Sequence, residues 1–228
     1  MKHKESYRIR SSECDEKDVM RLASLWDVMQ DAANEHARNL GLAYEDIHAR
    51  GLAWALIRMD AKIIRYPKYG ENIDVVTYPA GINKIYAIRH YRVFDAEGNE
   101  IAFANSSWIV VDVKTQRPLR AGKIFNEIFS GEYAGELCPK LGEVPGMAHK
   151  RDIIAEYSDI DPNQHVNNAR YINWVENEFA GKRISYINAN YIKEIKMGTI
   201  VEVWRDESDI EFRDKDGKPL FRSKVLLD

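Results

Sequence analysis

The sequence predicts an α+β protein made of two copies of one domain, each an antiparallel sheet wrapped around a central helix. Two observations lead there. An amphipathic helix is followed by a series of strand-like runs, and the same order recurs in the second half of the 228 residues. That length admits two domains of roughly 100 residues each. We expect the two sheets to pair into one continuous sheet, because pairing removes exposed edges. Two independent domains on a string are the alternative.

The first copy begins with a helix between residues 20 and 41. Its apolar residues recur at helical spacing, and Gly41 can end the helix as a C-cap. These apolar residues are Leu22, Leu25, Trp26, Met29, Ala32 and Ala33. Strand-like runs follow at 54–64, 72–79 and 85–112, and the last run contains the turn Asp95-Ala-Glu-Gly98. The first copy is therefore predicted to be a helix followed by an antiparallel meander.

The second copy repeats this order in a shorter form. Helix-spaced apolar residues between 169 and 179 precede strand-like runs at 184–195, 199–207, 210–217 and 219–228. Matched features are Trp26 and Trp174, 148 positions apart, Ala61–Gly70 and Ala189–Gly198, 128 apart, and the Asp95 and Asp214 turns, 119 apart. Offsets that fall in steps indicate the same elements joined by shorter loops. The pattern indicates an internal duplication.

We place the first domain at residues 1–114 and the second at 151–228, joined by a crossing linker at 115–150. The linker contains three of the seven prolines and five glycines. It is too long for a plain hinge, so we expect it to cross the surface and to carry a short helix near Asn126–Phe129.

Composition excludes several classes of function. The net charge of -3 is spread without long blocks, so we expect no nucleic-acid or membrane partner. Cys14 and Cys138 have neither CxxC spacing nor a nearby histidine cluster, so we expect free thiols and no metal or cofactor. The longest apolar run, Leu52–Ile57, is too short for a membrane span, and the first ten residues lack a signal-peptide core. These features predict a cytoplasmic protein.

The stretch SDIDPNQHVNNARYINWVE, residues 158–176, places more polar groups at a helix start than capping requires. If the lead-in is extended, Asp161, Asn163 and His165 alternate and project to one side. A carboxylate or imidazole can then accept a proton from water, and an amide can orient that water. A helix beginning near Asn167 or Asn168 offers backbone amides to an oxyanion. The stretch can therefore activate water.

A capped helix entrance with a surface histidine is the alternative interpretation. The first copy argues against it. In the register of Trp26 and Trp174, its corresponding segment, SSECDEKDVMR, lacks the Asp-x-Asn-x-His arrangement although the helix persists. We infer that the scaffold does not need the cluster.

Glu194 is a second candidate, because Tyr66 stands at its position in the first copy. Its flanking residues Ile192 and Ile195 predict a partly buried carboxylate. The alternative is an outward-facing strand residue that pairs with Lys193 or Lys196.

With these residues in place, the sequence resembles the acyl-acyl carrier protein thioesterases of the plant and bacterial type, which are built from two hotdog domains. The resemblance spans nearly the whole chain. It rests on residues 158–176, on NYIKEIKMG at 190–198, and on residues 54–79, which are similar to the family's Trp-x-x-x-Arg…Arg-Tyr-Pro-x-x-Gly run. Plant members often have Cys after the catalytic Glu, but Ile195 stands here, so a cysteine-protease-like mechanism is not supported. The transit peptide of plastid members is missing, which is consistent with a bacterial-type enzyme.

The resemblance implies hydrolysis of fatty acyl-acyl carrier protein (acyl-ACP), which releases free fatty acid and ends chain elongation. The family's catalytic residues fall on Asp161, Asn163, His165 and Glu194. We expect these to form a hydrogen-bonded set that deprotonates water, or a carboxylate to attack the thioester directly. Asn163 would hold the carboxylate or the water. The amides at the helix start, around Asn167 and Asn168, would bind the thioester oxygen.

The resemblance also implies that the first copy binds the acyl chain, with Trp54, Ile57 and Met59 as pocket candidates, although such a stripe is also typical of plain core. Lys150, Arg151, Lys182 and Arg183 are candidates for binding the carrier protein and its phosphopantetheine. A monomer and a homodimer are both compatible with an internal pair. The competing functions are an acyl-CoA thioesterase of the same fold, a non-catalytic acyl-thioester sensor and, with a poorer match, a hotdog dehydratase.

Overall fold

The computed structural model describes residues 2–125 and 137–228 and divides into two compact units, Met1–Cys138 and Pro139–Asp228. The boundary falls inside the segment expected to be a linker. That segment also contains β6 (Pro118–Leu119), α3 (Ala121–Ile124) and the start of β7 (Ala148–Ile154). The helix expected near Asn126–Phe129 lies outside the described residues.

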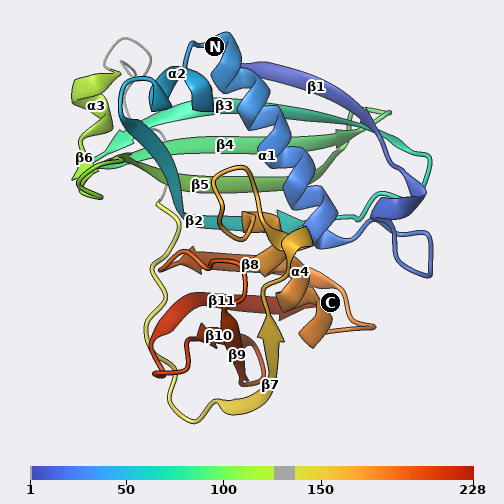
Figure 1. Cartoon of the computed structure of the whole chain (residues 1–228). Helices are drawn as coiled ribbons and strands as arrows, with labels where there is room; N and C mark the ends of the chain where they lie inside the picture. The colour runs from blue at the N-terminus through green and yellow to red at the C-terminus, as the bar shows by residue number, and fades with distance from the viewer. Residues whose placement is uncertain (1, 126–136) are drawn as a thin grey trace. The chain divides into compact units, whose positions relative to one another are not determined.

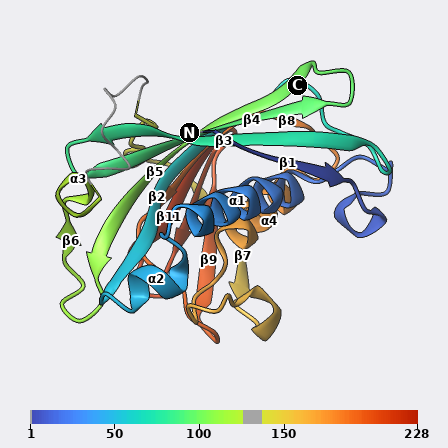
Figure 2. The ribbon, with the colours of Figure 1, turned by 90° about the horizontal axis from the view of Figure 1, so that it is seen from above.

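The first unit is an antiparallel sheet with one long helix on one face (Figures 1 and 2). Its strands run in the order β1-β3-β4-β5-β2, and β6 pairs with β5. The elements are β1 (His3–Arg8), the 3₁₀ turn η1 (Ser11–Glu13), α1 (Leu22–Asn39), α2 (Tyr44–His48), β2 (Leu52–Ile63), β3 (Asn72–Asn83), β4 (Tyr86–Asp95) and β5 (Glu100–Asp112). The predicted helix, meander and α+β class are confirmed.

Helix α1 packs through the apolar positions that its spacing predicted. Leu22, Leu25, Trp26 and Met29 are fully buried. Gly41 has φ 66° just past the helix end, a left-handed conformation that glycine adopts without steric cost. Leu40 is the C-cap, so the predicted cap is one residue off, and Gly41 is the left-handed residue that follows it.

Strand β2 contains a bulge. Its pairing with β5 changes register between Leu56 and Arg58, so that Ile57 is an extra residue. Buried positions accordingly change from Leu52 and Leu56 before the bulge to Met59 and Ile63 after it. The bulge lets a twelve-residue strand keep one face in the core.

The second unit has the same topology as the first. Its strands run in the order β7-β9-β10-β11-β8, which matches β1-β3-β4-β5-β2 strand for strand. The elements are β7, the 3₁₀ turn η2 (Tyr157–Asp159), α4 (Asn168–Glu178), β8 (Ile184–Tyr191), β9 (Ile200–Arg205), β10 (Asp209–Arg213) and β11 (Pro219–Leu227). The identical order supports the duplication inferred from the sequence.

An aromatic cluster holds α4 against its sheet. The ring of Tyr171 lies 5.2 Å from that of Phe221 and 5.3 Å from that of Tyr191, and Phe212 stacks on Phe221 at 5.1 Å. Buried rings in such edge and offset contacts contribute beyond the area that they bury. The cluster places the start of α4 over strands β8 and β11.

Both cysteines are free, as expected, and both are buried. Burial, and then the negative charge of the neighbouring Asp60 carboxylate, raise the pKa of the Cys138 thiol to about 12. Among the described residues, no helix is long and apolar enough to cross a membrane.

Candidate active site

The polar stretch that precedes α4 forms a tight turn. Ile160 and Val166 form an isolated antiparallel bridge, and the Asp161 N–H donates to the His165 carbonyl at 2.8 Å. Gln164, between them, has φ 64°. The extended lead-in that the alternation suggested is therefore wrong. A chain reversal brings Asp161, Asn163 and His165 together.

The Asp161 carboxylate is held by its own turn. Oδ1 accepts the backbone N–H groups of Asn163 at 2.8 Å and of His165 at 3.3 Å. Oδ2 accepts the Asn163 side-chain amide at 3.1 Å. This Asx-type arrangement fixes the direction of the carboxylate. Asn163 holds the carboxylate, which is one of the two roles predicted for it.

His165 pairs with Glu194 from the loop that follows β8. Nε2 of His165 lies 3.0 Å from Oε2 of Glu194. An ionised carboxylate can only accept, so Nε2 carries the hydrogen. When the imidazole is neutral, Nδ1 is therefore the nitrogen that can accept a proton. The pair has the orientation of a general base supported by a carboxylate.

The environment of Glu194 differs from both predictions. Its side chain is 59% exposed, so the expected partial burial is wrong. It also lies beyond the end of β8 at Tyr191, so it is not a strand residue. Lys193, one of the two lysines considered as its partner, contacts Asp214 at 3.8 Å instead. A loop carboxylate can approach His165 from the solvent side.

The start of α4 is capped internally. Asn167 is the N-cap, and its Oδ1 accepts the Ala169 N–H at 2.8 Å. The Arg170 N–H donates to the Asn167 carbonyl at 2.9 Å. Two amides near the helix start are thus already bonded within the chain. The oxyanion-binding role of Asn167 and Asn168 stays a prediction.

The first unit contains the same turn without the histidine. The Asp15 N–H donates to the Val19 carbonyl at 2.9 Å, and Asp15 Oδ1 accepts the N–H groups of Lys17 at 2.9 Å and Val19 at 3.1 Å. Asp18 has φ 57°, as Gln164 has 64° in the second unit. These bonds match Asp15 to Asp161, so the register taken from Trp26 and Trp174 is wrong here by two positions.

The prediction that the scaffold does not need the polar cluster is therefore wrong for its aspartate. The scaffold uses the turn aspartate in both units, where it binds the same two backbone N–H groups. Only the other members of the set are particular to the second unit. In the first unit, Lys17 occupies the position that corresponds to Asn163. Val19 corresponds to His165, and Tyr66 corresponds to Glu194. Asp161 therefore has a structural task besides the chemical one predicted for it.

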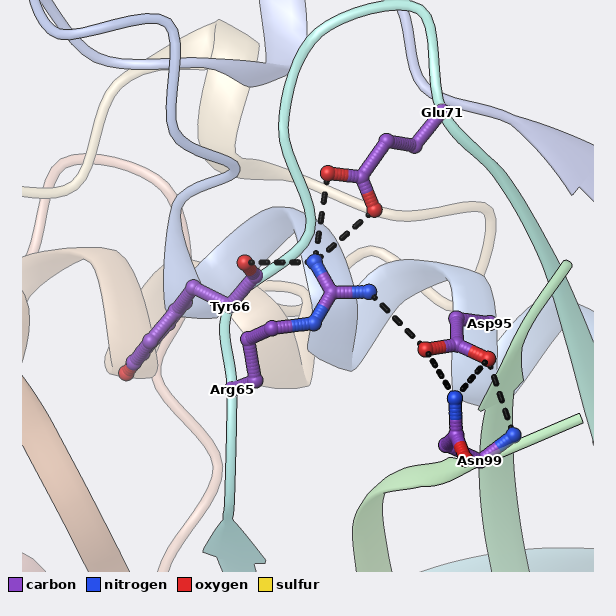
Figure 3. A network of polar contacts seen from close by, with 5 residues as sticks. All are labelled: Arg65, Tyr66, Glu71, Asp95 and Asn99. Carbon is purple, nitrogen blue, oxygen red and sulfur yellow. Dashed lines mark hydrogen bonds and ion pairs between the residues drawn. The ribbon is translucent and has the colours of Figure 1, made fainter. Parts of the chain in front are cut away.

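The loops opposite the two turns are anchored differently. In the first unit, Arg65 Nη1 binds the Glu71 carboxylate at 2.9 and 3.1 Å, and Arg65 Nη2 binds Asp95 at 3.3 Å (Figure 3). Asp95 in turn accepts the N–H of Asn99 at 2.8 Å. In the second unit the corresponding contact is the single Lys193–Asp214 pair. The Glu194 loop therefore has fewer charged anchors than the Tyr66 loop among the described residues.

Tyr171 is a site neighbour that the sequence argument missed. It is 3% exposed, and its hydroxyl accepts the backbone N–H of Ile195, the residue after Glu194, at 3.2 Å. Burial raises the pKa of Tyr171, and the negative charges of Glu194 and Asp161 raise it further against the effect of the Ile195 bond. In the sequence, the apolar spacing of the helix concealed this hydroxyl among core positions.

The candidates for the acyl pocket lie in the first unit. Met59 is fully buried, Trp54 packs on a core cluster with its ring 5.4 Å from that of Phe125, and Ile57 is the bulge residue. A cavity of about 410 Å³ beside α1, β1 and β3 has a different lining, which includes Glu5, Asp31 and Glu35. Burial and then these neighbouring acids raise the pKa of Asp31. This acidic lining does not suit an apolar tail, and the acyl-binding role of Trp54, Ile57 and Met59 stays a prediction.

Two of the basic candidates for carrier binding, Arg151 and Lys182, lie at the far end of α4. Arg151 Nε binds Glu178, the last residue of α4, at 2.7 Å, and the Lys182 N–H donates to the Phe179 carbonyl at 2.9 Å. His165 lies at the other end of this helix, which is about 16 Å long at 1.5 Å per residue. Lys150 and Arg183 lie next to these residues in the chain. The carrier-binding role of all four stays a prediction.

The chain belongs to the acyl-ACP thioesterase family. The model of the acyl-ACP thioesterase N-terminal domain matches residues 1–130, and that of the C-terminal domain matches residues 145–218. A chloroplastic acyl-ACP hydrolase of Cuphea viscosissima is 26% identical over 191 residues, which are 75% of this chain and 46% of that protein. A chloroplastic palmitoyl-acyl carrier protein thioesterase of Cuphea hookeriana is 27% identical over 188 residues, 75% of this chain and 45% of that protein. The chain spans about half the length of these curated relatives.

Solved structures have the same fold over the whole chain. An acyl-ACP thioesterase from Bacteroides thetaiotaomicron is 24% identical with a TM-score of 0.88, covering 100% of this chain and 98% of that one. The 12:0-ACP thioesterase from Umbellularia californica is 19% identical with a TM-score of 0.84, covering 100% and 97%. The fold implied by the sequence resemblance is confirmed.

Proposed function

We propose that this member of the acyl-ACP thioesterase family hydrolyses the thioester of fatty acyl-ACP, releasing free fatty acid and ending chain elongation. The observation that carries the proposal is the His165–Glu194 pair at 3.0 Å. The turn that carries His165 also holds the Asp161 carboxylate, which is oriented by three hydrogen bonds. The first unit has the same turn without the imidazole or the second carboxylate, so this pair is not required to build the fold.

In the proposed reaction, Nδ1 of His165 accepts a proton as the water oxygen attacks the thioester carbonyl carbon. Glu194, hydrogen-bonded to Nε2, stabilises the imidazolium that forms. The C–S bond then breaks, the thiolate takes the proton from His165, and fatty acid and the carrier thiol leave. Asp161 orients the water or the imidazole from its fixed position. The other route begins with attack of a carboxylate on the thioester, and water then hydrolyses the mixed anhydride.

The experiment that tests the function is thiol release from acyl-ACP and acyl-CoA thioesters of eight to eighteen carbons. Wild type is compared with His165→Ala and Asp161→Asn, and the asparagine is chosen because it keeps the oxygen that accepts the turn N–H groups. We expect hydrolysis that prefers the carrier substrate in wild type and loss of turnover in both variants. A folded wild type that binds acyl thioesters without releasing thiol would instead indicate the sensor, and equal or better use of acyl-CoA would indicate the CoA enzyme.

The two routes differ in the source of the new oxygen. In a single turnover in ¹⁸O-water, attack by water places one labelled oxygen in the fatty acid. If a carboxylate attacks and water then opens the anhydride at the enzyme's carbonyl carbon, the first fatty acid is unlabelled and the label stays on the protein. Unlabelled product would overturn the general-base assignment of His165.

We also propose that a carrier protein with a phosphopantetheine-linked acyl chain is the partner, that it contacts Lys150, Arg151, Lys182 and Arg183, and that the enzyme is cytoplasmic. Arg151 is partly neutralised by Glu178, so Lys150 and Lys182 are the better residues to change. Lys150→Glu with Lys182→Glu should raise KM for acyl-ACP and leave KM for acyl-CoA unchanged. An equal change for both substrates would contradict carrier docking at this end of α4.

A further inference from the structure

The backbone of a single residue, Ile195, joins the two halves of the candidate site. The Ile195 carbonyl accepts the N–H of Val166 at 2.8 Å, and the Ile195 N–H donates to the Tyr171 hydroxyl at 3.2 Å. Val166 follows His165, and Ile195 follows Glu194. Because both polar atoms of this residue's backbone are bonded to the turn and to helix α4, its position determines where the neighbouring Glu194 side chain begins.

In the first unit, different residues occupy the positions of Ile195 and Tyr171. Met20 donates to the Pro67 carbonyl at 2.9 Å, as Val166 donates to Ile195, so Pro67 corresponds to Ile195. The fourth residue of α1 is Leu25, and the fourth residue of α4 is Tyr171. Proline has no N–H to donate, and leucine has no atom to accept one. The donor and the acceptor are thus absent together in one unit and present together in the other.

This paired difference does not follow from packing alone. Both helix positions are buried, Leu25 at 0% and Tyr171 at 3% exposure. A buried backbone N–H without an acceptor is unfavourable, so a non-proline residue after Glu194 needs the hydroxyl. Proline would meet the same need by removing the donor. The second unit, which carries Glu194, uses the hydrogen bond.

We propose that Tyr171 is a positioning residue, which holds the 192–199 loop through the Ile195 N–H so that Glu194 meets His165. The inference rests on the proposed function for its kinetic consequence. It gives Tyr171 a task that the turn and the Glu194–His165 pair do not perform. The hydroxyl acts as a neutral acceptor, since its raised pKa keeps it protonated at working pH.

The test is a cycle of Tyr171→Phe, Ile195→Pro and the double variant. Tyr171→Phe keeps the ring contacts with Phe221 and Tyr191 and removes only the acceptor. Small displacements of catalytic groups reduce rates by up to about 100-fold, so we expect kcat to fall roughly 10-fold, with a smaller change in KM. In the Ile195→Pro background there is no N–H to hold, and Tyr171→Phe should change kcat less than about twofold.

Tyr7→Phe is the matched control, because the Tyr7 hydroxyl donates to Glu13 in η1, the 3₁₀ turn of the first unit. It removes a tyrosine hydrogen bond from that turn and should leave kcat within about twofold of wild type. A kcat for Tyr171→Phe equal to that of the control would overturn the proposal. Equal losses from Tyr171→Phe with and without Ile195→Pro would also overturn it, because the hydroxyl would then act without the Ile195 N–H.

Two further measurements separate this inference from the proposed function. Urea unfolding midpoints of the four cycle members report whether Tyr171 and Ile195 are coupled, and amide exchange reports protection of the Ile195 N–H. Neither needs activity. One outcome is that wild type releases no thiol while Tyr171 and Ile195 are coupled and the Ile195 N–H is protected. In that case the proposed function fails, and the inference that Tyr171 holds the 192–199 loop is supported. If wild type is active but neither is found, the positioning role fails alone.

Discussion

The two units share a strand order and a turn, yet among the described residues only the second unit pairs a histidine with a glutamate at that turn. Asp15 and Asp161 each accept two backbone N–H groups at equivalent positions of their own turn, so both units contain the same turn. Val19 and Tyr66 stand where His165 and Glu194 form their 3.0 Å pair. The comparison teaches that an aspartate in a polar motif can be required by the fold, so His165 and Glu194, which differ between the units, are the better candidates for the proposed chemistry.

The units also differ in how the loop opposite the turn is held. The first unit uses the half-exposed network of Arg65, Glu71 and Asp95 (Figure 3). The second uses the neutral hydrogen bond from Ile195 to Tyr171 and one long Lys193–Asp214 contact. A guanidinium bound by two carboxylates makes charge-assisted bonds, which are stronger than a neutral one. We infer that the loop carrying Glu194 is the more mobile of the two.

Removal of the imidazole should produce the largest difference between the units. His165→Ala takes away the group that accepts a proton and should lower kcat about a hundredfold to ten-thousandfold. Val19→Ala, at the corresponding position, should leave kcat within about twofold. Thiol release at saturating acyl-ACP measures both. A His165→Ala variant with wild-type kcat would remove His165 from the mechanism.

A second histidine, His36 of the first unit, should make the unfolding free energy depend on pH. His36 on α1 is 2% exposed, and its Nδ1 lies 3.1 Å from Arg89 Nη1. Burial, and then the positive charges of Arg89 and His3, lower the pKa of His36 to about 4. Because the unfolded pKa is about 6.5, the unfolded state binds the proton first as pH falls. The unfolding free energy should therefore be full above about pH 6.5 and decline by up to about 3 kcal/mol toward pH 4.

Other groups titrate in that window, so the measurement is a difference. His36→Gln keeps an acceptor for Arg89 and removes the titration. Urea unfolding of wild type and this variant should diverge in slope between pH 6.5 and 4, with wild type losing more stability. Parallel curves would contradict a neutral, buried His36 in the folded protein.

The turn aspartates should be equivalent for stability and different for activity. Asp15→Ala and Asp161→Ala each leave two backbone N–H groups without their acceptor, and each should lower the unfolding free energy by about 1–2 kcal/mol. Activity should disappear only in Asp161→Ala. Denaturation and thiol release on the same samples test this. A stability loss confined to one variant would break the equivalence of the turns.

The smallest expected effect concerns the loop anchors. Arg65→Ala should cost about 1 kcal/mol of stability, since it breaks contacts with two carboxylates at the half-exposed surface. Lys193→Ala breaks one contact at 3.8 Å and should cost less than about 0.5 kcal/mol. Amide exchange of the two loops in wild type sharpens the contrast. Faster exchange in 64–71 than in 192–199 would reverse our view of which loop is more mobile.

Much of the fold followed from apolar spacing. The helices at Leu22–Asn39 and Asn168–Glu178 and the strands of both meanders were predicted because their buried faces recur at regular intervals. The edge strands β1 and β7 were missed. Their sequences, HKESYR and AHKRDII, are rich in charge, and β7 is exposed along nearly its whole length. Their pairing with β3 and β9 depends on partner strands that are distant in the sequence.

The candidate site was predicted in membership but not in geometry. Asp161, Asn163, His165 and Glu194 lie in one hydrogen-bonded group, as the motif and the family resemblance suggested. The turn, the exposure of Glu194 and the two-position error in register were not foreseen. Each depends on backbone hydrogen bonds that leave no periodic pattern in the sequence.

The sequence by itself determined the α+β class, the duplication, the two main helices and the residue types available for hydrolysis, because these follow from local periodicity and composition. Only the tertiary structure decided that Asp161 also serves the turn, that His165 contacts Glu194 from another loop, and that Tyr171 binds the backbone N–H of Ile195, the residue after Glu194. The last two pairings join residues 29 and 24 positions apart in the sequence. Their distances are set by how the helix, the turn and the strand pack together, which no single stretch of sequence encodes.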